Sequence, residues 1–160
     1  MIRNVAQALG SRRLGGFYTE EIRVEGSRRG FTAVTFDGRR QDLARVDIGS
    51  QARVGRYGVD LAVVDELAER ALALELAAEI YLVDEIGKME CLSVRFVAAM
   101  GRLLDAGRPV VATIAERGGG FIAEVKARPD VGLWRVTRED RDRLPARVVA
   151  WLAERRRVPG

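Results

Sequence analysis

Beyond its N-terminal third, this 160-residue chain alternates apolar segments with amphipathic ones, and that alternation restricts the fold more than any other feature. The segments 80–84, 109–114 and 131–136 are short, apolar and bounded by turn residues, which is typical of buried strands. The segments 61–74 and 93–106 place apolar residues at helical spacing and so predict helices. Helices that alternate with apolar strands are typical of a layered α/β sheet with a parallel core.

The N-terminal third predicts antiparallel strands instead. Asp37-Gly38 separates the strand-like segments 29–36 and 39–46, and an Asp-Gly pair in this position is a strong signal for a β-hairpin. Strands at 14–19 and 21–24 would complete a small antiparallel patch. Further helices are expected at 2–9, at 121–127 and from Thr137 onward. The helix predicted over 93–106 has Ser93 as its N-cap and ends at Gly107.

The residue types present exclude several kinds of enzyme. The chain contains no histidine, which rules out Ser-His-Asp machinery, Cys-His machinery and histidine-bound metals. Cys91 is its only cysteine, and it has neither an apolar run long enough to span a membrane nor an apolar leader. We therefore expect a cytoplasmic protein with no membrane partner, whose chemistry depends on carboxylates and an oxygen-liganded cation such as Mg²⁺. The net charge of +4 comes from arginines scattered among acidic residues, which does not favour nucleic acid as a partner.

Asp84 and Glu85 end one of the predicted strands, within the sequence Ile-Tyr-Leu-Val-Asp-Glu-Ile-Gly-Lys-Met-Glu of residues 80–90. Sites in open α/β sheets form beyond the carboxyl ends of strands, where a carboxylate pair can hold Mg²⁺ and orient water for phosphoryl transfer. Because successive strand residues alternate, we expect Asp84 to hold the metal and Glu85, on the opposite side, to orient the water. Strands also often end in polar loops, so the pair by itself leaves both interpretations open.

Six segments of the chain, in the right order, resemble the small P-loop nucleoside-triphosphatases that include the human cancer-related nucleoside-triphosphatase and its bacterial and archaeal relatives. The segment 84–90, Asp-Glu-Ile-Gly-Lys-Met-Glu, is similar to the family's Walker B segment. The segment 136–142 is also similar, with Asp140 where the family usually has Asn. The other matching segments are 16–23, 29–31, 54–60 and 110–114.

The resemblance implies a three-layer α/β fold of the P-loop NTPase (RecA-like) type, with a mostly parallel sheet, helices on both faces and a small antiparallel hairpin insertion. It also implies Mg²⁺-dependent hydrolysis of nucleoside triphosphates, ATP and GTP among them, to diphosphates and phosphate. By position, Asp84 would bind the metal and Glu85 would be the catalytic base. Thr113 would sense the γ-phosphate or the water, or would simply be a β-branched strand residue. Lys88 would reach phosphate or pair with Glu90.

Other residues that the resemblance singles out have two interpretations each. Thr19, together with Glu20 and Arg23, would contact the nucleotide phosphates or the metal, or would belong to the solvated base of the hairpin. Arg141 would flank the nucleotide base, or would be an exposed charge in the first turn of a helix. Tyr57 is expected to serve packing rather than base stacking.

One part of the family pattern is missing, because no G-x-x-x-x-G-K-[ST] segment (Walker A) occurs in the sequence. We therefore expect a single domain over residues 1–160 that lacks the family's first strand and P-loop, leaves an open slot beside the Walker B strand and binds nucleotide poorly. A misplaced start, a truncated gene or a trimmed chain would each explain this. The leading function is a nucleoside-triphosphatase in its complete form, acting as a monomer on nucleoside triphosphates. The alternatives are a binding or regulatory module without catalysis and a nucleic-acid-associated protein.

Overall fold

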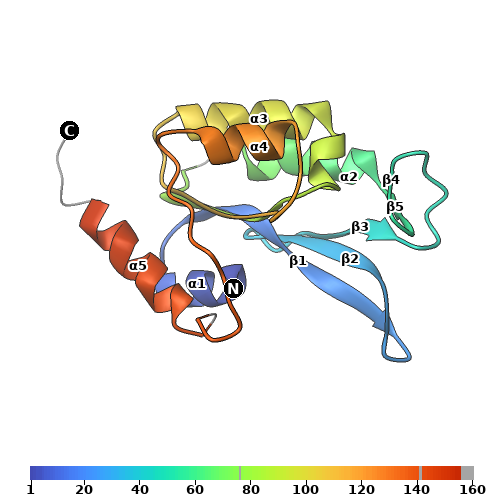
Figure 1. Ribbon diagram of the computed structural model, residues 1–160, viewed down its shortest axis with the longest axis horizontal. Coiled ribbons are helices and arrows are strands. Elements are labelled where there is room, and N and C mark those ends of the chain that lie inside the picture. Colours follow the sequence, from blue (N-terminus) through green and yellow to red (C-terminus); the bar gives the residue numbers. More distant parts are fainter. Residues whose placement is uncertain (76, 141, 156–160) are drawn as a thin grey trace.

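The computed structural model describes residues 1–75, 77–140 and 142–155. Its strands are β1 (Leu14–Val24), β2 (Ser27–Thr35), β3 (Arg40–Arg45), β4 (Arg53–Val54), β5 (Tyr57–Val59), β6 (Ile80–Ile86) and β7 (Val110–Ile114). Its helices are α1 (Ile2–Leu9), α2 (Leu61–Glu66), the π-helical turn η1 (Leu67–Ala71), the 3₁₀ turn η2 (Glu90–Leu92), α3 (Val94–Asp105), α4 (Phe121–Ala127) and α5 (Leu144–Arg155). The strands form one seven-stranded sheet in the order β4-β5-β3-β2-β1-β6-β7, with helices on both faces (Figure 1).

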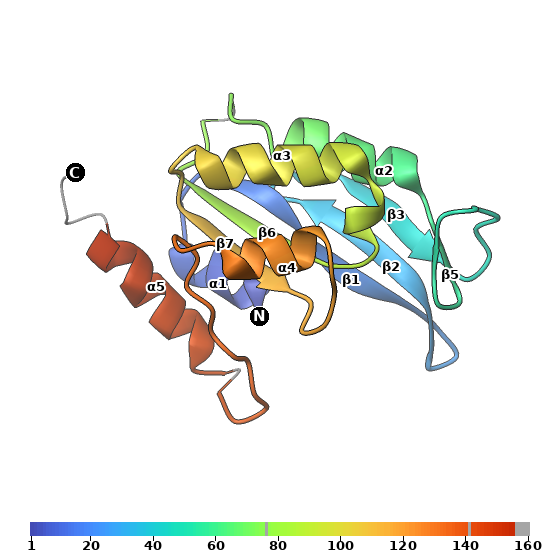
Figure 2. The ribbon, with the colours of Figure 1, turned by 45° about the horizontal axis from the view of Figure 1, so that its top comes forward.

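Strand β1 joins two differently built halves of the sheet. Its first residues, Leu14–Phe17, pair in parallel with Ile80–Val83 of β6, whereas Phe17–Val24 pair antiparallel with β2. The hairpin thus continues the main sheet and extends beyond the helices (Figure 2). Among the described strands only β1–β6 and β6–β7 are parallel neighbours, so the expectation of a mostly parallel sheet is wrong. The sheet is mixed because strands joined by tight turns must run antiparallel.

The two faces of the sheet carry separate apolar cores, which confirms the expected helices on both sides. Tyr81 and Val83 of β6 belong to the core under α2, α3 and α4. Ile80 and Leu82 belong to the core under α1 and α5. Consecutive residues of β6 alternate between the two faces, so β6 is buried on both and reads as a continuous apolar run in the sequence.

Local signals set three of the helix ends, among them the cap predicted at Ser93. The Ser93 hydroxyl accepts a hydrogen bond from the Phe96 N–H at 3.0 Å and caps α3. Asp60 caps α2 in the same way, accepting from the Ala62 N–H at 3.0 Å. Helix α1 ends before Gly10, which has a φ of 62°. Capping of this kind satisfies backbone N–H groups that have no partner within the helix.

The segment 131–136, a predicted strand, forms no strand in the structure. Strand β7 is the outer strand of the described sheet and all its residues are partly exposed, so its expected full burial is wrong as well. A strand needs a neighbour for its backbone hydrogen bonds, and segment 131–136 has none. Its Trp134 instead packs against Trp151 of α5, with ring centroids 6.1 Å apart.

The final helix begins later than predicted. Thr137 and Asp140 form a hydrogen-bonded turn, in which the Thr137 hydroxyl accepts from the Asp140 N–H at 3.2 Å and donates to its carboxylate at 3.0 Å. Helix α5 begins only at Leu144, followed by Pro145 in its first turn, a position that suits proline. The Thr137–Asp140 hydrogen bonds predicted as a helix cap are therefore present, but they stabilise a turn that precedes helix α5.

Strand β6 has a paired neighbour on each side, β1 and β7, so the open slot expected beside it is absent from the described sheet. The lack of a first strand and P-loop stays a prediction. None of the described helices is long and apolar enough to cross a membrane.

Replacing Gly16 with alanine should destabilise the fold by roughly 2–4 kcal/mol. Gly16 has a φ of 97°, and a Cβ there would lie 2.0 Å from the Leu82 carbonyl oxygen. Urea unfolding at equilibrium measures the loss. Gly101→Ala is the matched control, because a Cβ on Gly101 in α3 meets no atom within 4 Å and should be neutral or slightly stabilising. Equal unfolding midpoints for the two variants would contradict the close approach of β1 and β6.

Candidate functional site

A cavity of about 320 Å³ lies at the carboxyl end of β6. Asp84 and Glu85 both line it, and the peptide bond that joins them is cis. The cavity thus lies beyond the carboxyl end of a parallel strand, where sites of open α/β sheets are expected. The remaining lining residues are Thr19, Phe31, Leu43, Val54, Lys88, Met89, Glu90 and Ala115.

The expectation that Asp84 and Glu85 point to opposite sides of β6 is wrong. The register of β6 against β7 shifts at this point, because Val83 pairs with Ala112 whereas Ile86 pairs with Ile114. Three steps along β6 therefore match two along β7, as in a β-bulge, and the usual alternation of side chains is broken. The bulge is why one cavity receives both carboxylates.

Thr113 of β7 lies directly beside the acid pair. Its hydroxyl donates a hydrogen bond to Asp84 Oδ1 at 2.5 Å. The contact fixes the orientation of the Asp84 carboxylate, and within the described residues its other oxygen has no hydrogen-bond partner. A role for Thr113 toward phosphate or water stays a prediction.

A third carboxyl group, that of Glu90, completes the floor of the cavity. Glu90 is only 3% exposed, although glutamate is rarely buried without a cationic partner. A Cβ on Gly87 would lie 2.3 Å from Glu85 Oε1 and 2.8 Å from Glu90 Oε2, so both carboxyl groups close over this glycine. Sequence reasoning missed the burial of Glu90, because it lies in the short turn η2, where no periodicity indicates which side faces inward.

Burial raises the pKa values of two of these acids, Glu85 and Glu90. Burial is the main cause of a raised pKa at Glu85, and the negative charge of Asp84 adds to it. Burial likewise raises the pKa of Glu90 to about 7, against the opposing effect of hydrogen bonds from the backbone N–H groups of Glu90 and Gly87. Perturbed carboxyl groups that converge in a cavity are typical of functional sites.

The structure brings Thr19 to the cavity but not its neighbours. Glu20 instead pairs with Arg40 at 2.6 Å and with Arg3 at 3.0 Å. Arg23 bonds to Glu21 and to the Gly26 carbonyl oxygen near the hairpin tip. Of the three hairpin residues named from the sequence, only Thr19 lines the cavity.

Three other predicted residues have different outcomes. Lys88 is exposed and Glu90 is buried, and the described residues show no ion pair between them, so that predicted pair is wrong. Tyr57 packs against Phe31 with ring centroids 5.4 Å apart, which confirms its expected packing role. Arg141 lies outside the described residues.

Asp84 and Glu85 are the residues of this cavity that could hold a metal ion. The described residues include no cluster of three or more histidine, cysteine or acidic side chains that could enclose a metal. Mg²⁺ commonly binds one or two carboxylates and completes its shell with water and substrate phosphates. Asp84 and Glu85 in one open cavity match that requirement.

Comparisons with known proteins show which proteins the chain is similar to. Residues 1–149 match the sequence model of a family described as NTPase. The nucleoside-triphosphatase THEP1 of Thermotoga maritima is 39% identical over 131 residues, which cover 81% of this chain and 75% of the relative. The human cancer-related nucleoside-triphosphatase is 35% identical over 89% of this chain and 82% of its own length.

Two solved structures share the fold. The crystal structure of THEP1 from the hyperthermophile Aquifex aeolicus aligns with a TM-score of 0.84 and 31% identity, covering 94% of this chain and 90% of the other. The solution structure of a human cancer-related nucleoside triphosphatase aligns with a TM-score of 0.77 and 34% identity, covering 94% and 88%.

Glu90→Gln should change how stability depends on pH. The pKa of Glu90 is about 7 in the folded chain and 4.5 in the reference state, so the unfolded chain binds fewer protons between these values. The contribution of protonated Glu90 is therefore fully present below about pH 4.5 and is lost as pH rises through 7. The variant should gain up to about 3 kcal/mol over the parent between pH 4.5 and 8.

Urea unfolding midpoints at several pH values measure this difference. Glu124→Gln, at an exposed position on α4, is the control and should follow the parent at every pH. A Glu90→Gln profile that runs parallel to the parent's would show that Glu90 is not protonated in the folded state.

Proposed function

The chain belongs to the NTPase family of nucleoside-triphosphatases, and we propose that its acid cavity carries out Mg²⁺-dependent hydrolysis of nucleoside triphosphates to diphosphate and phosphate. The observation that carries the proposal is the pair of carboxylates, Asp84 and Glu85, in one cavity at the end of β6. Phosphoryl transfer requires mainly positioning and charge stabilisation from the protein, and two differently placed carboxylates can provide both.

Asp84 is the residue we propose for the metal. Its hydrogen bond from Thr113 holds the carboxylate at the cavity wall, so an incoming cation meets an oriented ligand. Bound Mg²⁺ would neutralise charge on the phosphate oxygens of the substrate. Thr19, which also lines the cavity, would donate a hydroxyl hydrogen bond to a phosphate oxygen.

Glu85 is the proposed catalytic base. Partial burial and the nearby Asp84 charge raise the pKa of Glu85, which makes its carboxylate a better proton acceptor than an exposed glutamate. In the reaction, the water oxygen bonds to the terminal phosphorus, the bond from that phosphorus to the diphosphate oxygen breaks, and Glu85 accepts the water proton. Gly87 leaves the space that this carboxylate occupies.

Lys88 is the cation best placed to receive a phosphate at this cavity. It lines the cavity and is exposed, and within the described residues no hydrogen bond or ion pair engages its ammonium group. An ammonium group is a compact charge that pairs well with phosphate oxygens. The proposed role of Arg141 beside the nucleotide base stays a sequence-based prediction.

A second candidate function is a binding or regulatory module without turnover. Thermal denaturation with Mg-ATP, together with an assay for released phosphate, separates the two. Stabilisation by nucleotide without phosphate release would favour the second candidate, and stabilisation with release would favour hydrolysis.

Glu85→Gln should lower kcat for Mg-ATP by about 10²- to 10⁴-fold, because the variant has no carboxylate to accept the proton. KM should change little, since the amide has the same shape and does not alter the apolar walls. Continuous detection of inorganic phosphate measures both constants. The control is again Glu124→Gln on α4, which should retain the parent's kcat. Unchanged kcat in Glu85→Gln would remove Glu85 from the reaction.

A further inference from the structure

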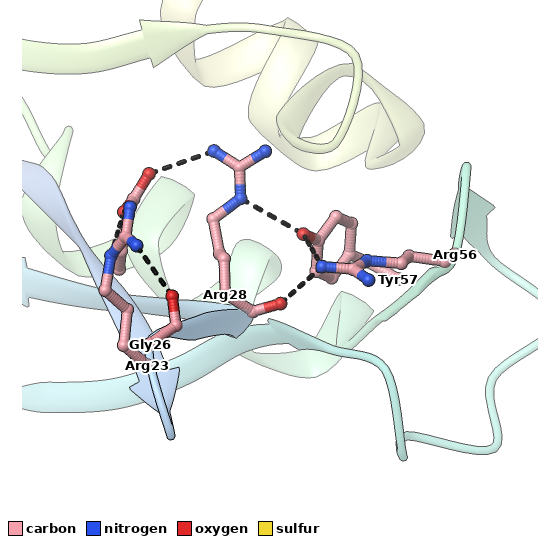
Figure 3. Close-up of polar contacts among 6 residues, drawn as sticks. Arg23, Gly26, Arg28, Arg56 and Tyr57 are labelled. Carbon is pink, nitrogen blue, oxygen red and sulfur yellow. Dashed lines mark hydrogen bonds and ion pairs between the residues drawn. The ribbon is translucent and has the colours of Figure 1, made fainter.

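Beyond the acid cavity, the β1–β2 hairpin and the turn between β4 and β5 bring together arginines with too few acidic partners (Figure 3). Glu21 uses both carboxylate oxygens, accepting from Arg28 at 2.9 Å and from Arg23 at 2.5 Å. Two guanidinium groups therefore share one carboxylate, and the guanidinium group of Arg56 has none among the described residues. We call Arg28, Arg56 and Tyr57 the arginine cluster.

Two of the cations converge on one neutral oxygen. Arg28 Nε donates to the Tyr57 hydroxyl oxygen at 3.1 Å, and Arg56 Nη2 donates to the same oxygen at 3.2 Å (Figure 3). Like charges held together repel, and a neutral phenol cannot cancel that repulsion. The hydrogen bonds from Arg56 and then Arg28 also lower the pKa of Tyr57. A lowered phenol pKa means that the surroundings favour negative charge at this oxygen. An anion between the two guanidinium groups would relieve the repulsion.

Aromatic rings hold the arginine cluster in place. The guanidinium carbon of Arg28 lies 5.2 Å from the centre of the Phe31 ring, and that of Arg56 lies 5.2 Å from the centre of the Tyr57 ring. Cation–π contacts of this kind orient a guanidinium plane without using its N–H groups. Within the described residues, Arg28 Nη2 and Arg56 Nε and Nη1 have no hydrogen-bond partner, so donors from both cations remain available.

The arginine cluster borders the acid cavity through Phe31. Phe31 lines the cavity together with Asp84 and Glu85, and Arg28 lies over its ring. We propose that the arginine cluster binds a phosphate group beside Phe31, next to this cavity. The N–H groups of a guanidinium match the spacing of phosphate oxygens. Two converging guanidinium groups can therefore donate three or more hydrogen bonds to one phosphate.

The phosphate can come from two sources, a nucleoside triphosphate or the inorganic phosphate that hydrolysis releases. The second source rests on the proposed function, whereas binding of free phosphate does not require turnover. The experiment below therefore measures binding first and separates the sources afterwards.

The test is a titration of the protein with inorganic phosphate at constant ionic strength, followed by NMR of the arginine Nε–H groups and the tyrosine rings. Saturable shifts are expected at Arg28, Arg56 and Tyr57. Arg28→Gln or Arg56→Gln should weaken binding by about tenfold or more, because each removes a charged hydrogen-bond donor. Arg29→Gln is the matched control: Arg29 is the exposed neighbour of Arg28 on β2, and the same charge change there should alter affinity by less than about twofold.

Arg28→Lys keeps the charge but removes the fork, so it should bind phosphate more weakly than the parent at an unchanged melting temperature. If Arg28→Gln does not fold, the phosphate affinity of Arg28→Lys is measured in its place. The proposal is overturned if Arg28 and Arg56 show no saturable shift, or if Arg29→Gln weakens binding as much as Arg28→Gln. A response to a single-stranded oligonucleotide without any response to phosphate would overturn it as well.

A final comparison identifies the source of the phosphate and uses the Glu85→Gln protein, which cannot consume the nucleotide if Glu85 is the base. ATP that displaces inorganic phosphate from the same resonances assigns the site to the nucleotide. Phosphate binding that ATP does not displace assigns it to the released product. If the Glu85→Gln protein binds phosphate and also keeps the parent's kcat, the catalytic role of Glu85 is refuted, whereas the proposal for the arginine cluster is retained.

Discussion

The parallel pairing of Leu14–Phe17 with Ile80–Val83 is the contact on which the rest of the structure depends. It places β6, which ends in the acid pair, beside β1, whose second half carries Thr19 and leads into the hairpin. The cavity is therefore lined both by β6 and by the hairpin. The approach is close enough that only glycine fits at position 16, where a Cβ would meet the Leu82 carbonyl oxygen.

Charge is distributed unevenly along this cavity. Asp84, Glu85 and Glu90 gather at its inner end, where burial raises the pKa values of the two glutamates. Exposed Lys88 also lines the cavity, and Arg28 of the arginine cluster lies over the ring of Phe31, another lining residue. An acidic inner end needs a cation to be fully ionised, and the basic side chains need an anion to relieve their repulsion. A metal-bound phosphate compound supplies both charges at once, which is why the acidic and basic groups make chemical sense together.

Sequence patterns predicted the elements whose signals are local. The apolar run ending in Asp84, the hairpin turn at Asp37-Gly38 and the cap at Ser93 all depend on a few neighbouring residues, and the structure confirms them. The failures involve distant neighbours. Segment 131–136 has a strand's composition, but its conformation depends on whether a sheet edge is available, and no local pattern contains that information.

The sequence by itself determined the alternation of helices and strands, the position of the acid pair at a strand end and the family to which the chain belongs. The tertiary structure decided that Asp84 and Glu85 share one cavity, because the β6–β7 register shift breaks the alternation that a regular strand would impose. It also decided that Glu90 is buried and that Arg28 and Arg56 meet at Tyr57, because these contacts join residues from turns and separate strands. Burial and convergence are properties of packing between segments, whereas a linear pattern records only what each segment can do alone.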